Sequence, residues 1–574
     1  MLASEQVNPY LDGVIKFCAI IGFIYIIKFL LVLFIDLWIG FKTYILPKLG
    51  KQEDLINKYG SWAVITGSTD GIGKEFAMEY AKRGLNICLI SRSIFKLQDT
   101  ANQIENKYGV CTKFIQADFS RTDVYDNIRK ELSDLDIGIL VNNVGIAMET
   151  PEPFLHENED FCWRILNVNI AAAVMMTSIV LPGMVARKRG LIVNVGSQSG
   201  VFPVPYMSLY SSSKAFLNMF STCLELELEN KNIRVQCLVG GWIDTKLLEK
   251  YTGVLKFYRR FFPWVLPTAS QYAASAVNTL SSGNNFTCGY WGHSLFLVFA
   301  QFTTGRYTQA RMAKFLVIIT GSTDGIGKEF AMEYAKRGLN ICLISRSISK
   351  LQDTANQIVN KYGVNTKFIQ ADFSRTDVYD NIRKELSDLD IGILVNNVGI
   401  AMETPEPFLH ENEDFYWRIL NVNIAAAVMM TSIVLPGMVA RNRGLIVNMG
   451  SQTGIIPVPY MSVYSSSKAF INMFSTCLEL ELENKNIRVQ CLLGGWIHTK
   501  LMDKYTGVVK LYRRYFPWVL PTAARYAASA VSTISSGNNY TSGYWGHALF
   551  LAITEFTTGR YLQARIAKAV VKPK

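Results

Sequence analysis

Short runs rich in β-branched residues alternate along the chain with longer stretches of helical periodicity. Such runs are typical of strands in a buried sheet. In the first half of the chain we expect six strands, at Ala63–Thr66, Asn86–Ile90, Thr112–Gln116, Ile139–Asn142, Leu191–Val195 and Arg234–Val239. Helical stretches of about 12–30 residues separate them. This alternation predicts an α/β fold in which helices wind around a parallel sheet on both faces.

The same pattern occurs twice. Residues 61–314 recur at 315–568 with a constant offset of 254 positions and no insertion. About 35 of these 254 positions differ, so the copies are roughly 86% identical. Because residues 1–60 occur only once, we divide the chain into an N-terminal part, 1–60, a first copy, 61–314, and a second copy, 315–574. A true gene fusion and a mis-joined gene model would both give this sequence.

An apolar segment near the N-terminus predicts a transmembrane helix. Phe17–Ile35 is 19 residues long and carries one charge, Lys28, and this length spans a bilayer core of about 30 Å. One central Lys costs about 3 kcal/mol on insertion, which the many Ile, Leu, Phe and Val residues outweigh at about 0.3–0.6 kcal/mol each. A signal peptide is the competing interpretation, but no small-residue cleavage site follows. The lysines around the segment are Lys16 before it and Lys42, Lys48 and Lys51 after it. This bias predicts that the domains that follow are cytosolic.

Composition adds less to the picture. The net charge of +12 could suit a nucleic acid, an anionic membrane surface or an anionic substrate. Lys and Arg scattered over solvated helix faces explain it more simply, so we expect no nucleic-acid partner. The ten cysteines form no CxxC pair and have no histidine partner at metal-ligand spacing. We therefore expect reduced, buried cysteines and no metal site.

A glycine-rich loop follows the first strand of each copy. The sequence ITGSTDGIGKEFA, Ile65 to Ala77, ends a strand and opens a helix. Glycines there permit a tight turn and close approach of a pyrophosphate, which the free N–H groups at the helix start can bind. This context predicts a Rossmann-like dinucleotide site rather than a merely structural turn. The expected contacts are Gly67, Ser68, Asp70, Gly71, Ile72 and Gly73 in the first copy and Gly321, Ser322, Asp324, Gly325, Ile326 and Gly327 in the second.

The ends of the next strands predict which dinucleotide binds. Arg92 stands where an acid would bind the ribose 2′-hydroxyl of NAD, and a guanidinium suits the 2′-phosphate of NADP instead. Lys96 lies one turn further on, and Asp118 is placed to accept from the adenine amine. Asn142 and Gly145 close the fourth strand. The matching residues of the second copy are Arg346, Lys350, Asp372, Asn396 and Gly399. We therefore expect NADP(H) as the cofactor.

A candidate reaction centre follows the fifth strand. Tyr210 and Lys214 are four residues apart on one predicted helix and share a face, and Ser197 lies thirteen residues before the tyrosine. A phenol titrates near 10, and a neighbouring ammonium lowers that pKa. The tyrosine can then exchange a proton with an alkoxide or alcohol, while Ser197 donates a hydrogen bond to the same oxygen. The predicted long helix before that strand carries Asn169.

The phrases TGSTDGIG, NNVG and YSSSK, together with the strand-end serine, resemble the short-chain dehydrogenase/reductase family. KYGSWAVITGSTDGIGKEFA, LVLPGMVARKRGLIVN and PVPYMSLYSSSK resemble the branch of membrane-anchored 17-beta-hydroxysteroid dehydrogenases and very-long-chain 3-oxoacyl-CoA reductases. Insect and nematode steroid-dehydrogenase-like proteins belong to it. The resemblance implies that Tyr210 is the acid/base, that Lys214 assists it and also contacts the cofactor with it, that Ser197 orients the carbonyl, and that Asn169 holds a relay water. The implied second set is Asn423, Ser451, Tyr464 and Lys468.

Two departures from the family pattern lie after the sixth strand. Gly240-Gly241 replaces the usual Pro-Gly before Thr245, which predicts a more flexible loop beside the nicotinamide. Thr245 and its counterpart Thr499 are expected to contact the cofactor. Asp244 becomes His498 in the second copy. Further on, RRFFPWVLP is interpreted as a lid over an apolar substrate, with helical core as the alternative, and LFLVF as helical core or membrane contact.

We therefore expect an NADP(H)-dependent oxidoreductase that interconverts a ketone and a secondary alcohol on a lipophilic substrate, either a 3-oxoacyl-CoA or a steroid. The alternative is a catalytically silent protein that binds a lipid or a partner on the same scaffold. By the resemblance we expect an endoplasmic reticulum membrane protein with cytosolic catalytic domains. The helices near 157–187 and 207–230 are expected to pair copies, either as an internal pseudo-dimer, with TTGRYTQARMAK unravelled as a linker, or as a dimer with another chain.

Overall fold

A computed structural model describes most of the two copies. The described residues are 19, 23, 27, 34–35, 38–49, 53–148, 152–245, 259–295, 316–402, 405–500, 512–533 and 539–557. Most of the expected transmembrane segment and the expected linker between the copies lie outside them.

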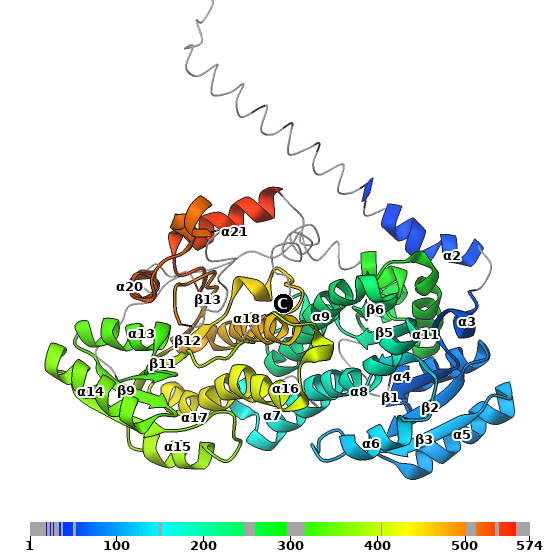
Figure 1. The fold of residues 1–574 in the computed structure, drawn as a ribbon, viewed down its shortest axis with the longest axis horizontal. Coiled ribbons are helices and arrows are strands. Elements are labelled where there is room, and N and C mark those ends of the chain that lie inside the picture. Colours follow the sequence, from blue (N-terminus) through cyan, green and yellow to red (C-terminus); the bar gives the residue numbers. More distant parts are fainter. Residues whose placement is uncertain are drawn as a thin grey trace, which may run out of the picture.

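The first copy forms a seven-stranded parallel sheet in the order β3-β2-β1-β4-β5-β6-β7 (Figure 1). The strands are β1 (Trp62–Thr66), β2 (Asn86–Ser91), β3 (Thr112–Gln116), β4 (Ile137–Asn142), β5 (Gly190–Val195), β6 (Ile233–Leu238) and β7 (Phe286–Thr287). The six expected strands are confirmed within two residues at each end. The strand order reverses between β1 and β4, where doubly wound sheets bind ligands at the carboxyl ends of their strands.

Helices cover both faces of this sheet. They are α4 (Gly71–Lys82), α5 (Ile94–Tyr108), α6 (Tyr125–Leu132), α7 (Glu159–Leu166), α8 (Ala172–Arg187), α9 (Ser208–Leu228) and α11 (Ala269–Asn278). Apolar residues of α4, α5 and α11 form one core with the sheet, and those of α6, α7, α8 and α9 form the other. Local signals agree with this arrangement: the Ser93 side chain caps α5, and Gly109 ends it in the left-handed region at φ 67°.

The second copy repeats this architecture, with the sheet order β10-β9-β8-β11-β12-β13-β14. Its strands are β8 (Leu316–Thr320), β9 (Asn340–Ser345), β10 (Thr366–Gln370), β11 (Ile391–Asn396), β12 (Gly444–Met449), β13 (Ile487–Leu492) and β14 (Tyr540–Thr541). Its helices are α13 (Gly325–Lys336), α14 (Ile348–Tyr362), α15 (Tyr379–Leu386), α16 (Glu413–Leu420), α17 (Ala426–Ala440), α18 (Ser462–Leu482), α20 (Ala523–Thr533) and α21 (Trp545–Thr557).

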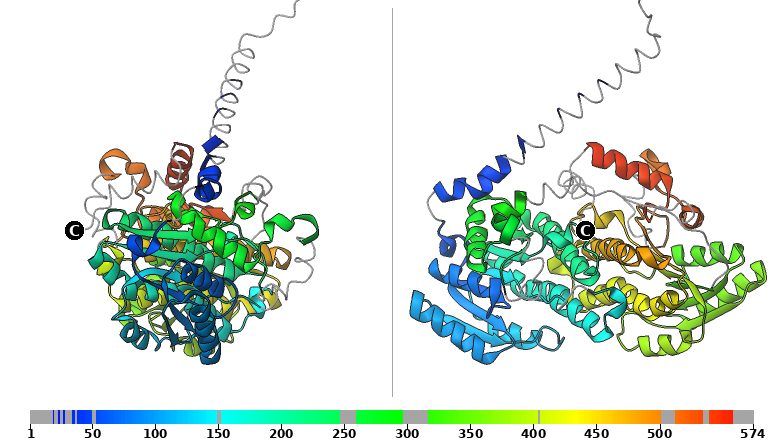
Figure 2. Two further views of the ribbon diagram at one scale, coloured as in Figure 1. Left: turned by 90° about the vertical axis from the view of Figure 1, so that its right-hand side faces the viewer. Right: turned by 180° about the vertical axis from the view of Figure 1, so that it is seen from behind.

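The two copies contact each other through equivalent helices, with α9 beside α18 (Figures 1 and 2). One apolar core runs without a break from the first copy into the second. Aromatic pairs cross the boundary in both directions: Phe154 packs edge-on against Phe474, and Phe220 against Phe408, with centroids 5.1 Å and 5.3 Å apart. At the rim, Arg383 pairs with Glu159 at 2.7 Å. Large apolar cores carry most of such an interface, whereas exposed ion pairs add little.

Two described helical segments are long and apolar enough to cross a membrane, Glu159–Arg187 and Glu413–Ala440. About 72% of each apolar window is buried within the protein. These segments are α7 with α8 and α16 with α17, so their apolar character reflects the shared core of the two copies. Residues before the first copy also contact it. The Tyr44 hydroxyl is hydrogen-bonded to the Thr287 hydroxyl at 2.8 Å and to the Ser294 hydroxyl at 2.7 Å.

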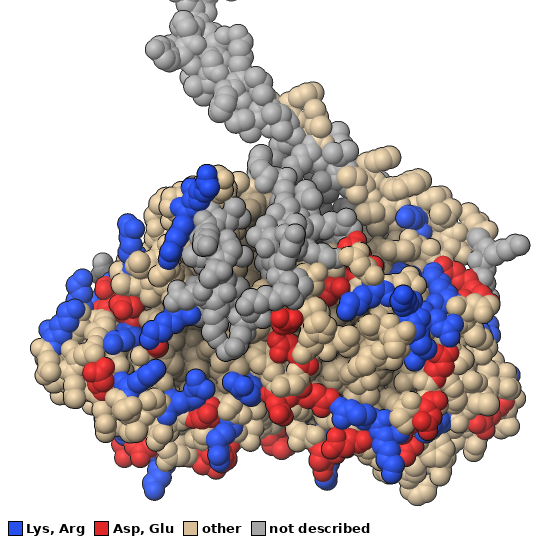
Figure 3. Space-filling view, viewed as in Figure 1, with Lys and Arg blue, Asp and Glu red and all other residues tan. Residues whose placement is uncertain are grey.

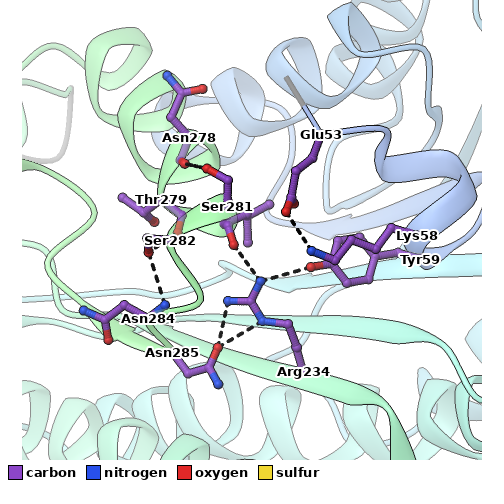
Figure 4. A network of polar contacts seen from close by, with 11 residues as sticks. Glu53, Lys58, Tyr59, Arg234, Asn278, Thr279, Ser281, Ser282, Asn284 and Asn285 are labelled. Carbon is purple, nitrogen blue, oxygen red and sulfur yellow. Dashed lines mark hydrogen bonds and ion pairs between the residues drawn. The ribbon is translucent and has the colours of Figure 1, made fainter. Parts of the chain in front are cut away.

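A polar network fixes the residues just before the first copy to β6 (Figure 4). The Arg234 guanidinium donates to the Tyr59 hydroxyl at 3.1 Å and to the carbonyl of Leu280 at 2.7 Å. It also donates to Asn285 Oδ1 from two nitrogens, at 3.1 Å and 2.8 Å. Tyr59 ends the short helix α3 (Leu55–Tyr59). The N-terminal part therefore enters the first copy along a defined path.

Candidate functional site

The glycine-rich loop lies at the carboxyl end of β1, at the reversal point of the sheet. Gly67 and Gly71 have φ of 65° and 52°, in the left-handed region. A Cβ on Gly73 would lie 2.3 Å from the Gly67 carbonyl oxygen, so only glycine fits there. Asp70 caps α4 by accepting from Gly71 N at 2.9 Å. The amides of Ile72 and Gly73, next in the first helical turn, have no acceptor within the helix and can bind an anion.

An asparagine that sequence reasoning passed over supports this loop. Asn143 Nδ2 donates to the carbonyls of Thr66 and Gly67 at 2.9 Å and 3.1 Å. The neighbouring Asn142, expected to contact the cofactor, instead donates inside the fold to Asn194 Oδ1 at 2.8 Å and to the Thr177 hydroxyl. The Asn142 side chain is therefore structural, because successive strand residues point to opposite faces. Asn396 repeats this in the second copy, bonding Asn448 and Thr431.

Charged residues gather at the ends of β2 and β3. Burial acts to raise the pKa of Asp118, but hydrogen bonds from Ser120 and the charges of Arg92 and Arg164 outweigh it, so this pKa is lowered. Arg92 is exposed. Lys96 Nζ lies 3.7 Å from Asp70 Oδ2 at the glycine-rich loop. The second copy repeats the lowered pKa at Asp372, so the predicted adenosine-binding residues do converge at one edge of each sheet.

Tyr210 and Lys214 lie on the first two turns of α9, and their counterparts Tyr464 and Lys468 on α18. Lys214 Nζ is 5.7 Å from the centroid of the Tyr210 ring and donates to the Val195 carbonyl at 2.9 Å. Burial lowers the pKa of Lys214 to about 8, and that of Lys468 likewise.

The electrostatics of the tyrosine differ from the expectation that the lysine lowers its pKa. Burial raises the pKa of Tyr464 to about 12, although a hydrogen bond with Ser451 acts against the rise. The ammonium of Lys468 donates to the Met449 carbonyl at 2.8 Å, and its Nζ lies 5.8 Å from the Tyr464 ring centroid. Desolvation of the phenolate is therefore the dominant influence on the pKa of Tyr464. At neutral pH the phenol holds its proton, which suits it to donate.

Asn169 lies where the long helix departs from regular α geometry. A π-helical turn, Asn167–Ala171, separates α7 from α8, and such turns occur often at functional sites. Asn169 Oδ1 accepts from Ile146 N at 2.8 Å, and Nδ2 donates to the Ile146 carbonyl at 2.9 Å. A Cβ on Gly145 would lie 3.6 Å from both Asn169 Oδ1 and Lys214 Nζ. The structure thus brings the predicted Asn, Lys and Gly together.

The loop after β6, for which Gly240-Gly241 predicts flexibility, is hydrogen-bonded to His293. Gly241 N donates to His293 Nδ1 at 3.1 Å, and His293 Nε2 lies 2.9 Å from the carbonyl oxygen of Val265. Burial lowers the pKa of His293 to about 4, so the ring stays neutral and keeps its acceptor. Thr245 lies beside the glycine-rich loop, with its methyl carbon 3.7 Å from where a Cβ on Gly71 would stand. No sequence pattern indicated a role for His293, because its partner Gly241 is 52 residues away in the chain.

The aromatic segment after this loop is partly exposed. Trp264 stacks on Trp291 at 5.9 Å, whereas Phe261 and Phe262 face solvent. Arg259 donates to both carboxylate oxygens of Asp244, at 3.0 Å and 2.9 Å. The expected lid, Arg259–Pro267, lies wholly within the described residues, whereas residues 246–258 before it do not. Of LFLVF, only Leu295 is described, and it is exposed.

A glycine-rich turn at the reversal point of a doubly wound sheet, with a buried Tyr–Lys pair beside it, is the arrangement of a dinucleotide-dependent oxidoreductase. The sequence profile of the short chain dehydrogenase family matches residues 61–253 and, again, 316–507. The chain therefore belongs to this family, in two tandem copies, and the resemblance drawn from its motifs is confirmed.

Relatives within the family carry different descriptions. The chain is 44% identical over 300 residues to a human protein named inactive hydroxysteroid dehydrogenase-like protein 1, covering 52% of this chain and 88% of that one. It is also 44% identical over 258 residues to zebrafish (Danio rerio) very-long-chain 3-oxoacyl-CoA reductase-A, covering 45% and 77%. A crystal structure of the N-domain of a bacterial malonyl-CoA reductase with NADP covers 76% of this chain and 91% of its own, at a TM-score of 0.58 and 15% identity. That likeness shows the fold.

Proposed function

We propose that the protein is an NADP(H)-dependent oxidoreductase that reduces a ketone on a lipophilic substrate, with one active site in each copy. The observation that carries this proposal is the complete Tyr–Lys–Ser–Asn set in both copies, Tyr210, Lys214, Ser197 and Asn169 in the first. The second set is Tyr464, Lys468, Ser451 and Asn423.

The groove fits a dinucleotide phosphate. A Cβ on Gly73 would clash with the Gly67 carbonyl oxygen and Asn143 Nδ2, so the loop packs closely on α4, whose first amides have no acceptor within the helix. Arg92 and Arg346 supply a guanidinium for a 2′-phosphate, with Lys96 and Lys350 beside them. Thr245 and Thr499 lie beside the glycine-rich loops, near Gly71 and Gly325. NADPH bound here would supply the hydride.

The residues of this chain then manage the proton. The Tyr210 phenol donates its proton to the substrate oxygen as negative charge develops there. The Ser197 hydroxyl donates a hydrogen bond to the same oxygen, and Lys214 keeps a positive charge near the phenolate that forms. Asn169 holds the segment after β4 against α9, through Ile146 and the Ser213 hydroxyl. Each role in the second copy follows by the offset of 254 residues.

An apolar substrate suits the surroundings of the second tyrosine. Met402, Val458 and Met461 form a small buried cluster that packs against Tyr464. This apolar cluster supports the preference for a lipophilic ketone. The family branch suggests two classes of such substrates, 3-oxoacyl-CoAs and steroids. The rival proposal, a silent binding protein, finds support in relatives named inactive. The intact tyrosines and serines of both copies favour catalysis.

We further propose that the protein sits on the cytosolic face of the endoplasmic reticulum membrane. Helical residues 38–44 expose Trp38 and Phe41, while Thr43 is buried against the first copy. At the same end of the molecule, α21 exposes Trp545 (60%), Leu549 (45%) and Ile553 (46%), which share one helix face (Figures 1 and 2). Aromatic and apolar residues grouped this way suit the membrane interface. On the face drawn in Figure 3, by contrast, basic and acidic residues intermix.

The test is an NADPH oxidation assay with a panel of 3-oxoacyl-CoAs and ketosteroids. Turnover of at least one substrate is expected, and Tyr210→Phe with Tyr464→Phe should lower it by about 10²–10⁴-fold while NADPH still binds. Residual activity above roughly a hundredth of normal contradicts the acid/base role. NADPH binding without turnover of any substrate supports the silent alternative.

A further inference from the structure

Both catalytic helices begin without a capping side chain of their own. α9 starts at Ser208 and α18 at Ser462, and the Met residue before each makes no side-chain hydrogen bond to the helix. Two residues before each helix a tyrosine, Tyr206 or Tyr460, takes a φ of 63° or 65°. A bulky residue rarely adopts this left-handed conformation unless its surroundings hold it there. Something outside the helix must therefore stabilise its first turn.

That group comes from the other copy. Glu227, near the end of α9, accepts at Oε1 from Tyr460 N at 2.8 Å and from the Ser462 hydroxyl. Its Oε2 accepts from Phe408 N at 2.9 Å. The side chain is 5% exposed. Burial raises the pKa of Glu227 to about 7, and the hydrogen bonds from Ser462, Phe408 and Tyr460 act against this rise.

The second copy returns the same contacts. Glu481, near the end of α18, accepts from Tyr206 N at 2.9 Å, from the Ser208 hydroxyl and from Phe154 N at 2.8 Å. Each contact is the first copy's contact shifted by 254 residues. This reciprocity is what a self-complementary, two-fold interface produces.

We propose that Glu227 is a positioning residue for the active site of the second copy, and Glu481 for that of the first. Tyr464 lies two residues after Ser462, so the capped turn carries the proposed acid. Glu227 accepts from the Tyr460 amide and the Ser462 hydroxyl at the start of α18, and a carboxylate in that position matches the helix dipole. Each catalytic helix is thus completed in trans, and a copy without its partner would lack the cap.

The inference rests on the proposed function for its kinetic test. Glu227→Gln is placed in two backgrounds, Tyr210→Phe, where only the second site works, and Tyr464→Phe, where only the first works. We expect kcat to fall about tenfold or more in the first background, because the Gln amide turns an N–H toward a donor, and to change less than about twofold in the second. Glu481→Gln should give the opposite pattern.

Hydrogen exchange provides a readout that needs no substrate. Peptides that span Tyr460 and Tyr206 are distinguishable by mass, because Val463 in one corresponds to Leu209 in the other. Glu227→Gln should speed exchange of the Tyr460 amide about tenfold and leave the Tyr206 amide unchanged. The exchange measurement tests the inference even if no substrate turns over. An absence of turnover would count against the proposed function alone.

Two further variants serve as controls for the Glu227→Gln experiment. Ser462→Ala removes one donor and should act in the same direction with a smaller effect, which covers the case in which Glu227→Gln does not fold. Glu229→Gln, at an exposed position two residues after Glu227, should leave both copies unchanged. An effect of Glu227→Gln confined to its own copy, or equal in both copies, overturns the proposal.

Discussion

Replacing Gly73 by Ala tests the cofactor groove at its tightest point. The new Cβ would lie 2.3 Å from both the Gly67 carbonyl oxygen and Asn143 Nδ2, whereas ordinary contacts begin near 3.4 Å. The loop must therefore move by about 1 Å, and a shift of that size in a binding constellation costs on the order of 100-fold. We expect the affinity of the first copy for NADPH to fall by about that factor, with a stability loss of about 1–3 kcal/mol from overpacking.

Titration calorimetry with NADPH measures this directly. The unaltered chain should bind at two equivalent sites, Gly73→Ala at one, and Gly73→Ala with Gly327→Ala at neither, because Gly327 has the same 2.3 Å approach. Gly109→Ala is the control: its φ of 67° strains an alanine backbone, but nothing lies within 4 Å of its Cβ, so both sites should remain. Two sites of unchanged affinity in Gly73→Ala would refute the assignment of this loop to the cofactor.

Arg92→Asp with Arg346→Asp should shift preference from NADPH to NADH, because an acid binds a 2′-hydroxyl and repels a 2′-phosphate; equal use of both cofactors by the unaltered chain would sink this claim. Reduction should slow as the pH rises through about 8, where the two buried active-site lysines lose their charge; a flat rate across that range contradicts their role. Neither glycosylation sequon, at Asn285 or Asn539, should carry glycan in a cytosolic domain; an endoglycosidase mass shift mapped to either would overturn the orientation. Light scattering on detergent-solubilised protein should give the mass of one chain; a two-chain mass means that each copy pairs with another chain.

Sequence reasoning succeeded where the signal is local. The six long strands, the glycine-rich turn and the spacing of Tyr210 and Lys214 all depend on neighbouring residues, and the structure places them as expected. β7 was missed because it has only two residues and pairs at the sheet edge. His293 and Glu227 were missed because their partners are far away in sequence, 235 residues away for Ser462. The internal hydrogen bonds of Asn142 were not expected, because a pair of adjacent asparagines does not reveal which side chain is held inside the fold.

The two copies are identical in the proposed catalytic residues but differ beside the loop after the sixth strand. The Tyr, Lys, Ser and Asn residues and the glycine-rich loops are identical in the two copies. Beside the loop after the sixth strand, however, the first copy neutralises Arg259 with Asp244, whereas the second places His498 against Arg513. An imidazole cannot neutralise a guanidinium as a carboxylate does, so the second entrance is the more positive. A more positive entrance attracts an anionic substrate head group more strongly. Because the residues proposed to exchange the proton are the same, we expect this asymmetry to act on substrate binding, so that the two sites differ in KM rather than in kcat.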